Sequence, residues 1–268
     1  MIGTELIKQD NNPERVFTSA DGHTGPVLAD ITCPDGVVRV TVDPAATVAR
    51  VQVRTDDPTG PAAAAVKDTR IHQTAERLTI VVPPTPPTTQ TFNRGVFVSG
   101  NRHSTVQING VTFNNYGGRG TTVVGSTGVE VLVTLPAGSA VKYVSENGSI
   151  HTYGALAALK AVATNGSVKA ESVGRIEAEA DNGSVKVGTV TEWIDAEASN
   201  GSVKVDNYEG SEARLRAGNG SVTLTVAPAA TGRIVAKAGN GSVKLHGVRH
   251  RGDLNVQASA GNGTVKKS

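Results

Sequence analysis

The feature that most constrains the fold of this chain is a short motif, Asn-Gly followed by Ser or Thr, that recurs through its C-terminal half. The motif begins at seven positions: Asn147, Asn165, Asn182, Asn200, Asn219, Asn240 and Asn262. Consecutive copies lie 17 to 22 residues apart. Self-similarity at so short a period is typical of proteins that stack one structural unit many times. We therefore expect residues 126–268 to form one repetitive domain.

Between two motifs, apolar and charged residues alternate. In the unit that begins at Asn165, the apolar positions are Val168, Ala170, Ile176, Ala178 and Ala180. The charged positions are Lys169, Glu171, Glu177 and Glu179. Successive side chains of a β-strand point to opposite faces, so the pattern predicts two strands per unit, with apolar residues inside and charged residues outside.

The motif itself predicts a tight corner. Asn and Gly are the residues that most readily adopt positive φ, and we expect that conformation at every copy. Length variation falls in the other corner of the unit, from "ESVG" to "HGVRHRGD". The predicted structural corner residues are Asn147, Gly148, Asn165, Gly166, Asn182, Gly183, Asn200, Gly201, Asn219, Gly220, Asn240, Gly241, Asn262 and Gly263.

Two all-β architectures fit this pattern. Asn-Gly between alternating strands is a strong hairpin signal, and seven hairpins would give an antiparallel meander. Such a meander leaves a wide apolar face uncovered, whereas a coil buries each unit against its neighbours. We therefore favour a parallel β-solenoid, a single-stranded β-helix with rungs of about 17–22 residues. Stacking at about 4.8 Å would align the corner Asn side chains and allow amide hydrogen bonds between rungs.

The rest of the chain divides into three segments. Residues 1–26 are polar and aperiodic, which predicts an irregular N-terminal arm. Residues 27–84 contain alternating runs such as "VVRVTVD", which predict strands that begin the solenoid. Residues 85–125 are rich in Pro, Gly and Asn and are expected to be a linker or insertion, although "STVQINGVTF" within them is a candidate for one further rung.

These motifs resemble the bacterial putative-adhesin family, whose members carry repeated short β-strands. The resemblance rests on "GVVRVTV", "RLTIVVP", "VEVLVTLPAGSAVKYVSENGSI" and the serial "NGSVKV", and covers residues 27–84 and 126–268. It implies a β-solenoid with an adhesive or unassigned role, and it implies no catalytic residue. The segment 85–125 departs from the family pattern.

Composition narrows the classes of partner. The formal net charge is +2, which is too small to imply nucleic acid but allows a local basic stripe. Cys33 is the only cysteine, so the chain has no intrachain disulfide or cysteine metal site. The N-terminal sequence lacks a signal peptide and no apolar run is long enough to span a membrane, which predicts a soluble, cytoplasmic protein that could be released or join a larger particle.

Catalytic, metal and cofactor motifs are missing from the sequence. His246 and His250 are the one close pair of histidines, and the neighbouring Arg249 and Arg251 oppose a cation. The corners carry Asn and Ser instead of the Asp of calcium-binding solenoids. We therefore predict no catalytic residue, no metal and no cofactor. A polysaccharide-active β-helix enzyme remains the least favoured alternative, because few aromatic residues could stack on sugars.

The leading hypothesis is a non-enzymatic, adhesin-like module that presents a regular surface to a protein or surface polymer, or that assembles. Self-association through the C-terminal edge, which Lys266 and Lys267 would guard, is one form of that assembly. The alternative is polyanion or carbohydrate binding along an outward column of lysines that Thr223 interrupts. Its members are Lys169, Lys186, Lys204, Lys244 and Lys266. Glu171, Glu177 and Glu179 are expected to lie among these lysines and to weaken their field.

Overall fold

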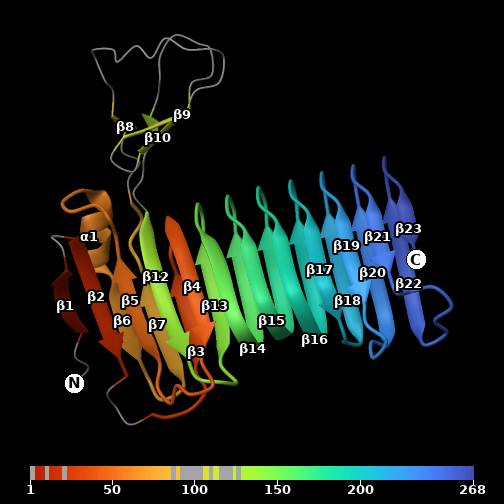
Figure 1. The fold of residues 1–268 in the computed structure, drawn as a ribbon, viewed down its shortest axis with the longest axis horizontal. Helices are drawn as coiled ribbons and strands as arrows, with labels where there is room; N and C mark the ends of the chain where they lie inside the picture. Colours follow the sequence, from red (N-terminus) through yellow and green to blue (C-terminus); the bar gives the residue numbers. More distant parts are fainter. Residues whose placement is uncertain are drawn as a thin grey trace.

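The fold is described by a computed structural model, which covers residues 4–9, 12–19, 23–85, 89–90, 105–108, 111–114, 123–124 and 128–268. Among these residues nearly all of the regular structure is β-strand, and one continuous 19-stranded system coils along the long axis of the molecule (Figure 1). The short helix α1 (Pro61–Asp68) lies at the N-terminal end of the stack.

The repeats form a parallel β-solenoid, as the sequence predicts. Each of the strands β14 (Ser149–Ala163), β15 (Val168–Ala180) and β16 (Val185–Ala198) bends at its second corner and contributes to both broad faces. The later rungs use two separate strands each. They are β17 (Val203–Tyr208) with β18 (Glu212–Ala217), β19 (Val222–Val226) with β20 (Gly232–Ala238), and β21 (Val243–His246) with β22 (Leu254–Ala260), followed by β23 (Val265–Lys267).

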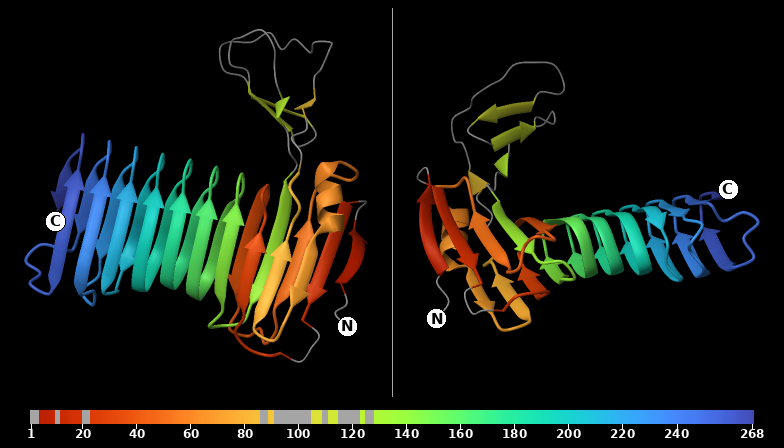
Figure 2. Two further views of the ribbon diagram at one scale, coloured as in Figure 1. Left: turned by 180° about the vertical axis from the view of Figure 1, so that it is seen from behind. Right: turned by 60° about the horizontal axis from the view of Figure 1, so that its bottom comes forward.

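Equivalent strands of neighbouring rungs pair in parallel throughout the repeats. This pairing excludes the antiparallel meander. We call the layer that contains β17, β19, β21 and β23 the first sheet, and the layer that contains β18, β20 and β22 the second sheet. The early halves of β14, β15 and β16 belong to the first sheet and their late halves to the second. Figure 1 and the left view of Figure 2 show this stack from opposite sides.

Both sheets continue toward the N-terminus with strands from distant parts of the chain. The first sheet adds β4 (Gly36–Val42) and β12 (Val129–Leu135) in parallel, then β5 (Arg50–Arg54), β2 (Asn12–Thr18) and β1 (Thr4–Gln9), all antiparallel. The second sheet adds β13 (Ala140–Ser145), β3 (Leu28–Thr32) and β7 (Arg77–Val81) in parallel, then β6 (Arg70–Gln73), which is antiparallel.

Two N-terminal features differ from the sequence-based expectation. The irregular arm expected over residues 1–26 is wrong, because β1 and β2 form an antiparallel pair there. Their period-two signal is weak, since Pro13, Glu14 and Phe17 are the buried residues of β2. Helix α1 was not anticipated within the β region. The Asp57 carboxylate accepts hydrogen bonds from the backbone N–H groups of Gly60 and Ala62 (2.7 and 3.2 Å), which stabilises the first turn of that helix.

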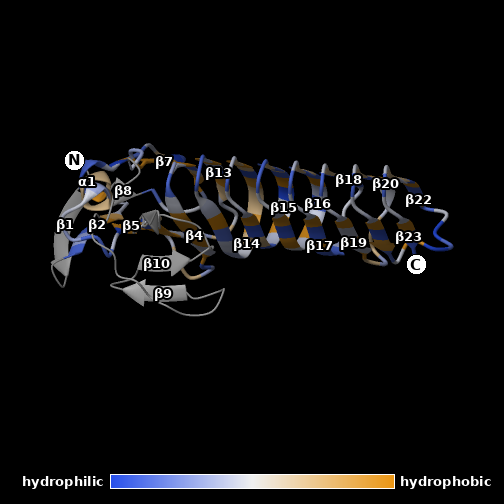
Figure 3. Cartoon of the chain, turned by 90° about the horizontal axis from the view of Figure 1, so that it is seen from above, coloured by the Kyte–Doolittle hydropathy of each residue, from blue (hydrophilic) through white to orange (hydrophobic). Residues whose placement is uncertain are grey.

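The core runs along the inside of the coil. In the rung of β15, the five predicted inward residues are buried, from Val168 at 0% exposure to Ala170 at 6%. Figure 3 shows the alternation as apolar and polar bands that continue from rung to rung. Full burial of a Val or Ile side chain contributes roughly 1.5–3 kcal/mol. Because each rung shares its buried surface with two neighbours, the stack is stable where a single rung would not be.

The Asn side chains of the Asn-Gly corners form a ladder of hydrogen bonds. Every corner Asn from Asn165 to Asn262 donates a hydrogen bond from its Nδ2 to the Oδ1 of the Asn one rung earlier, at 2.6–2.9 Å. The series ends at Asp35, whose carboxylate accepts the bond from Asn147 at 2.9 Å. The predicted Asn column is therefore confirmed, and Asn262 extends it by one rung.

The reason for glycine at these corners is not the predicted one. Positive φ among the described glycines occurs at Gly25, Gly36, Gly138, Gly154, Gly232 and Gly247, none of which belongs to an Asn-Gly motif. A Cβ atom on Gly183 would instead overlap the backbone carbonyl oxygen of Gly166, and the same overlap recurs at Gly166, Gly201, Gly220, Gly241 and Gly263. Glycine is needed because successive backbones approach so closely.

Between β7 and β12 the described residues form two small separate sheets. β8 (Thr89–Gln90) pairs with β11 (Val123–Val124), and β9 (Thr105–Ile108) pairs with β10 (Val111–Asn114), both antiparallel. Neither sheet joins the solenoid. "STVQINGVTF" is therefore not a rung, because its two strands pair with each other as a hairpin. The segment boundaries that the sequence suggests stay a prediction.

Candidate binding surface

The five predicted lysines lie in one row on the outer face of the first sheet. Strand pairing places Lys169 beside Lys186 and Lys186 beside Lys204. Thr223 follows, then Lys244 and Lys266. All five lysine side chains are exposed. The repeat spacing thus produces the predicted column, including its single interruption.

The row is longer than the sequence-based analysis proposed. His151 pairs with Lys169 on one side and with Arg39 of β4 on the other. We call the full set the basic row: Arg39, His151, Lys169, Lys186, Lys204, Thr223, Lys244 and Lys266. His151 could have been found, because it follows Asn147 at the same distance at which Lys169 follows Asn165. Arg39 carried no such signal, since β4 lies outside the repeats.

Few carboxylates balance the row. Lys204 forms an ion pair with Asp206 at 2.6 Å, and Arg39 pairs with Glu130. Within the described parts of the chain, no carboxylate lies within 4.0 Å of the ammonium groups of Lys169, Lys186, Lys244 or Lys266. These four positive charges are therefore available to an anion.

The expectation that three glutamates lie among the lysines is wrong for two of them. Glu177 and Glu179 belong to the late half of β15, where Glu177 is paired with Lys160 and lies in the second sheet. Glu171 is on the first sheet, and its Oε2 accepts a hydrogen bond from the backbone N–H of Gly154 at 2.9 Å. The sequence pattern shows which residues point outward, but it does not show on which of the two sheets they lie.

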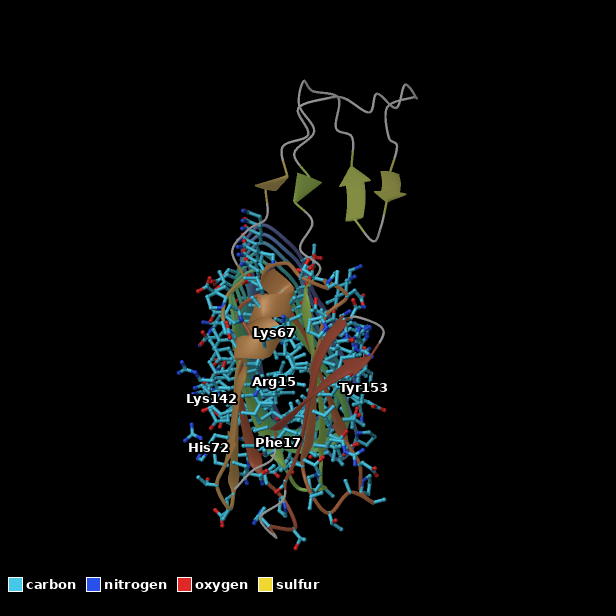
Figure 4. All side chains as sticks on the ribbon, turned by 90° about the vertical axis from the view of Figure 1, so that its left-hand side faces the viewer. Arg15, Phe17, Lys67, His72, Lys142 and Tyr153 are labelled. Atoms are coloured by element: carbon cyan, nitrogen blue, oxygen red, sulfur yellow. The ribbon has the colours of Figure 1, made fainter. Side chains whose placement is uncertain are left out.

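The two outer faces point in opposite directions. Figure 4, which looks along the stack, shows Tyr153 of the first sheet on one side and Lys142 and His72 of the second sheet on the other. On the second sheet, charges of both signs pair with one another. Lys160 binds Glu177 at 2.7 Å, Arg216 binds Glu197 at 3.5 Å, and Arg214 lies 3.8 Å from Asp195. The second sheet is thus largely neutralised, unlike the basic row.

A row of hydroxyl groups runs beside the basic row. Its members lie two residues before members of the basic row: Ser149, Ser167, Ser184, Ser202, Ser221, Ser242 and Thr264. From Ser149 to Ser242, each Oγ accepts a hydrogen bond from the backbone N–H of the next member, at 3.0–3.5 Å. We call this set the hydroxyl row. These serines are half-buried, and the alternation of side chains places them on the side of the sheet that carries the cations.

His151 is the member of the basic row whose charge changes near neutral pH. Its pKa lies below the ordinary histidine value, first because partial burial disfavours the charged imidazolium, and then because Lys169 and Arg39 repel it. The imidazole is therefore mostly neutral at pH 7. Acidification adds one positive charge between Arg39 and Lys169.

Other predicted chemical features have structural roles. Burial raises the pKa of the Cys33 thiol to about 12, with a smaller contribution from Asp35, so this thiol stays protonated. The Arg251 guanidinium is engaged within the chain, because it binds the Asp253 carboxylate (2.6 and 2.8 Å) and the carbonyl oxygen of Ala227 (3.2 Å). His246 Nδ1 lies 2.9 Å from Ser268 Oγ. In the described ranges, no group of three or more His, Cys, Asp or Glu side chains could hold a metal ion.

Comparison with known proteins gives one family model and two solved structures to which this chain is similar. The family model described as Toastrack DUF4097 matches residues 65–267. A solved structure from Clostridium sporogenes, titled as a putative cell adhesion protein, is 15% identical, with a TM-score of 0.37 over 96% of this chain and 98% of its own. One from Bacteroides fragilis, titled as a putative adhesin, is 15% identical, with a TM-score of 0.40 over 94% and 97%.

A search of the curated proteins finds no match. No helix in the described ranges has the length and apolar character needed to cross a membrane.

Proposed function

The chain belongs to the Toastrack DUF4097 family, and we propose that it is a non-enzymatic, adhesin-like binding module that holds an extended anionic partner along its first sheet. One observation carries the proposal. Strand pairing aligns Lys169, Lys186, Lys204, Lys244 and Lys266 in a single exposed row. A regular line of cations on a flat sheet is complementary to a polymer that carries anions at regular intervals.

The scaffold suits such a role because it fixes the row without help from a ligand. Inward residues beside the lysines, such as Val168, Val185 and Val203, are fully buried, and the Asn ladder joins the corners of all seven repeat copies. Neighbouring cations are therefore held about 4.8 Å apart. Binding to a prearranged row costs less conformational entropy than binding to a row that must first become ordered.

Like charges at this separation repel by roughly 0.8 kcal/mol per pair in water before salt screening. A surface that only needed to be soluble could reduce this repulsion with the ion pairs that are present on the second sheet. The basic row keeps most of its charges unbalanced, which is why we favour an anionic partner over a purely solvated face.

The test replaces the five lysines of the basic row by Gln and measures binding to immobilised heparin, polyglutamate and polyphosphate at low ionic strength. The matched control removes five cations from the second sheet by changing Lys160, Arg214, Arg216, Arg233 and Lys237 to Gln. We expect the row variant to lose binding and the control to retain it, since both lose the same net charge. Equal loss in both variants, or no binding by the wild-type protein to any of the three polymers, would rule the proposal out.

A further inference from the structure

The hydroxyl row gives each rung a second binding group beside its cation. Each Oγ from Ser149 to Ser242 already accepts a backbone N–H. A hydroxyl group has one hydrogen to donate as well as its acceptor lone pairs. Because the backbone N–H uses the acceptor side, the hydroxyl hydrogen of Ser167, Ser184 or Ser202 is the part left for a ligand. The surface therefore offers donors to a ligand, both as ammonium and as hydroxyl groups.

The spacing of the two rows defines the shape of the ligand. The cation and the hydroxyl residue of one rung are two residues apart along the chain, which is roughly 6.6 Å for extended backbone. The same pair repeats in the next rung about 4.8 Å away. A matching ligand is a single extended chain whose units each carry one anionic group and, on the same edge, neutral oxygen atoms that accept hydrogen bonds.

The first sheet lacks the groups that would favour single-stranded nucleic acid. Proteins that bind single strands without sequence preference stack bases on aromatic side chains. Within residues 128–268, Tyr153 is the one Phe, Tyr or Trp on the outer face of the first sheet, since Tyr143 and Tyr208 are buried and Trp193 lies on the second sheet. An extended acidic polypeptide also carries neutral carbonyl oxygens, but its carboxylates on one face recur about 6.6 Å apart, which does not match the spacing of about 4.8 Å between rungs.

From these observations we propose that the basic row and the hydroxyl row together form a binding site for an acidic polysaccharide, with each rung contacting a carboxylate or sulfate through its cation and a ring or hydroxyl oxygen through its Ser. This inference rests on the proposed function and adds the class of ligand. Lys169 with Ser167, Lys186 with Ser184, and Lys204 with Ser202 form three consecutive pairs at the centre of the surface.

The first experiment compares polymers of equal charge number: a polyuronate, polyglutamate and single-stranded DNA, with dextran as the neutral control. We expect the wild-type protein to bind the polyuronate about tenfold more tightly than polyglutamate. One or two additional net hydrogen bonds from the hydroxyl row to the polyuronate are enough to lower its dissociation constant by about that factor. Binding to dextran should be absent. Tighter binding to DNA, or equal binding to polyglutamate and polyuronate, would overturn the glycan assignment while leaving the proposed function intact.

The second experiment separates the two rows. Changing Ser184 and Ser202 to Ala should bring the polyuronate-to-polyglutamate ratio close to one while leaving the salt dependence of binding unchanged. Changing the same two residues to Thr, the residue that occupies this position at Thr264, should preserve the ratio. If the Ala variant keeps the wild-type preference, the hydroxyl row does not contact the ligand and the inference fails. Melting temperatures of both variants verify that the fold is retained.

The third experiment repairs the gap in the basic row. Thr223 stands between Lys204 and Lys244. The variant Thr223→Lys should tighten polyuronate binding, and the slope of log K against log salt should steepen, because one more ionic contact releases further counterions; for single-stranded nucleic acid the change per contact is about 0.7. An unchanged slope would show that the polymer does not follow the row. Loss of binding to every polyanion in the Lys→Gln variant of the row is the separate requirement of the proposed function.

Discussion

At the residue scale, the Asn-Gly motif serves stacking more than turning. Asn165 and Asn182 each donate to the rung before and accept from the rung after. Gly183 lies so close to Gly166 that no side chain fits between the two backbones. The position of every corner could be predicted from the sequence. The reason for its glycine could not, because it depends on the distance between neighbouring rungs, and the turn propensity of a residue carries no information on that distance.

The first prediction concerns that close approach. Gly183→Ala should lower the free energy of unfolding by about 1–3 kcal/mol, because an overpacked position forces the backbone to shift. Gly252→Ala is the matched control, since a Cβ there would meet nothing within 4 Å. Chemical denaturation of both variants measures the difference. Equal stability of the two variants would contradict the stacking explanation.

The second prediction concerns His151 and its neighbours in the row, Arg39 and Lys169. Its pKa is lower in the folded protein than the usual 6.5 of an exposed histidine, so the unfolded chain binds more protons as the pH falls below that value. The contribution of His151 to stability is therefore present above about pH 6.5 and is lost on acidification.

Denaturation of the wild-type protein and of His151→Gln across pH 5–8 tests this sign. As the pH falls, the free energy of unfolding of the wild-type protein should decrease relative to that of His151→Gln. In the variant Lys169→Gln, the pKa of His151 measured by NMR should rise, because one repulsive charge is gone. A constant difference across this pH range would contradict the proposed electrostatic environment.

At the element scale, the strands in which apolar and polar residues alternate could be predicted from the sequence. The elements without this alternation could not. The runs that became β4, β5, β12 and the strands of the repeats follow the period-two pattern, because one side of each is buried in the core. β2 does not follow it, and α1 arises from an Ala-rich stretch with Pro61 at its first position. The sequence pattern also could not predict which sheet carries Glu177, because the chain passes from the first sheet to the second at a bend inside β15.

The third prediction concerns the segment between β7 and β12. The hairpin of β9 and β10 pairs with no strand of the solenoid, while β8 and β11 pair with each other at the two ends of the segment. Deleting Thr91–Thr121 should therefore leave folding of the solenoid intact, since shortening a surface connection changes its closure entropy only slightly. Circular dichroism and the melting temperature check the result, and unfolding of the deletion variant would show that the segment supports the stack.

At the scale of the whole molecule, a solenoid whose rungs are alike must prevent further rungs from adding at its edge. β22 and β23 form that edge in the structure, and Leu254, Val256 and Val265 are only partly covered there. Strand pairing places Lys267 opposite Leu245, a position that is apolar and buried in Val187, Val205, Leu224 and Leu245 of the earlier rungs. A charge at an inward position of an edge strand discourages pairing with another chain.

The last prediction separates the two neighbouring lysines of β23. Lys266 belongs to the outward basic row, whereas Lys267 takes the inward position. Lys267→Val should therefore promote association of this chain with further copies, because no charge would then have to be buried when another strand pairs with β23, and Lys266→Val should not. Sedimentation velocity over a range of protein concentrations measures the difference. Arg249 already occupies one backbone group of this edge, because its Nε donates a hydrogen bond to the carbonyl oxygen of Lys267 at 2.7 Å. The double variant Arg249→Ala with Lys267→Val should therefore associate more strongly than Lys267→Val alone. Equal behaviour of the two single variants would mean that the edge is guarded by overall charge and not by the inward position of Lys267.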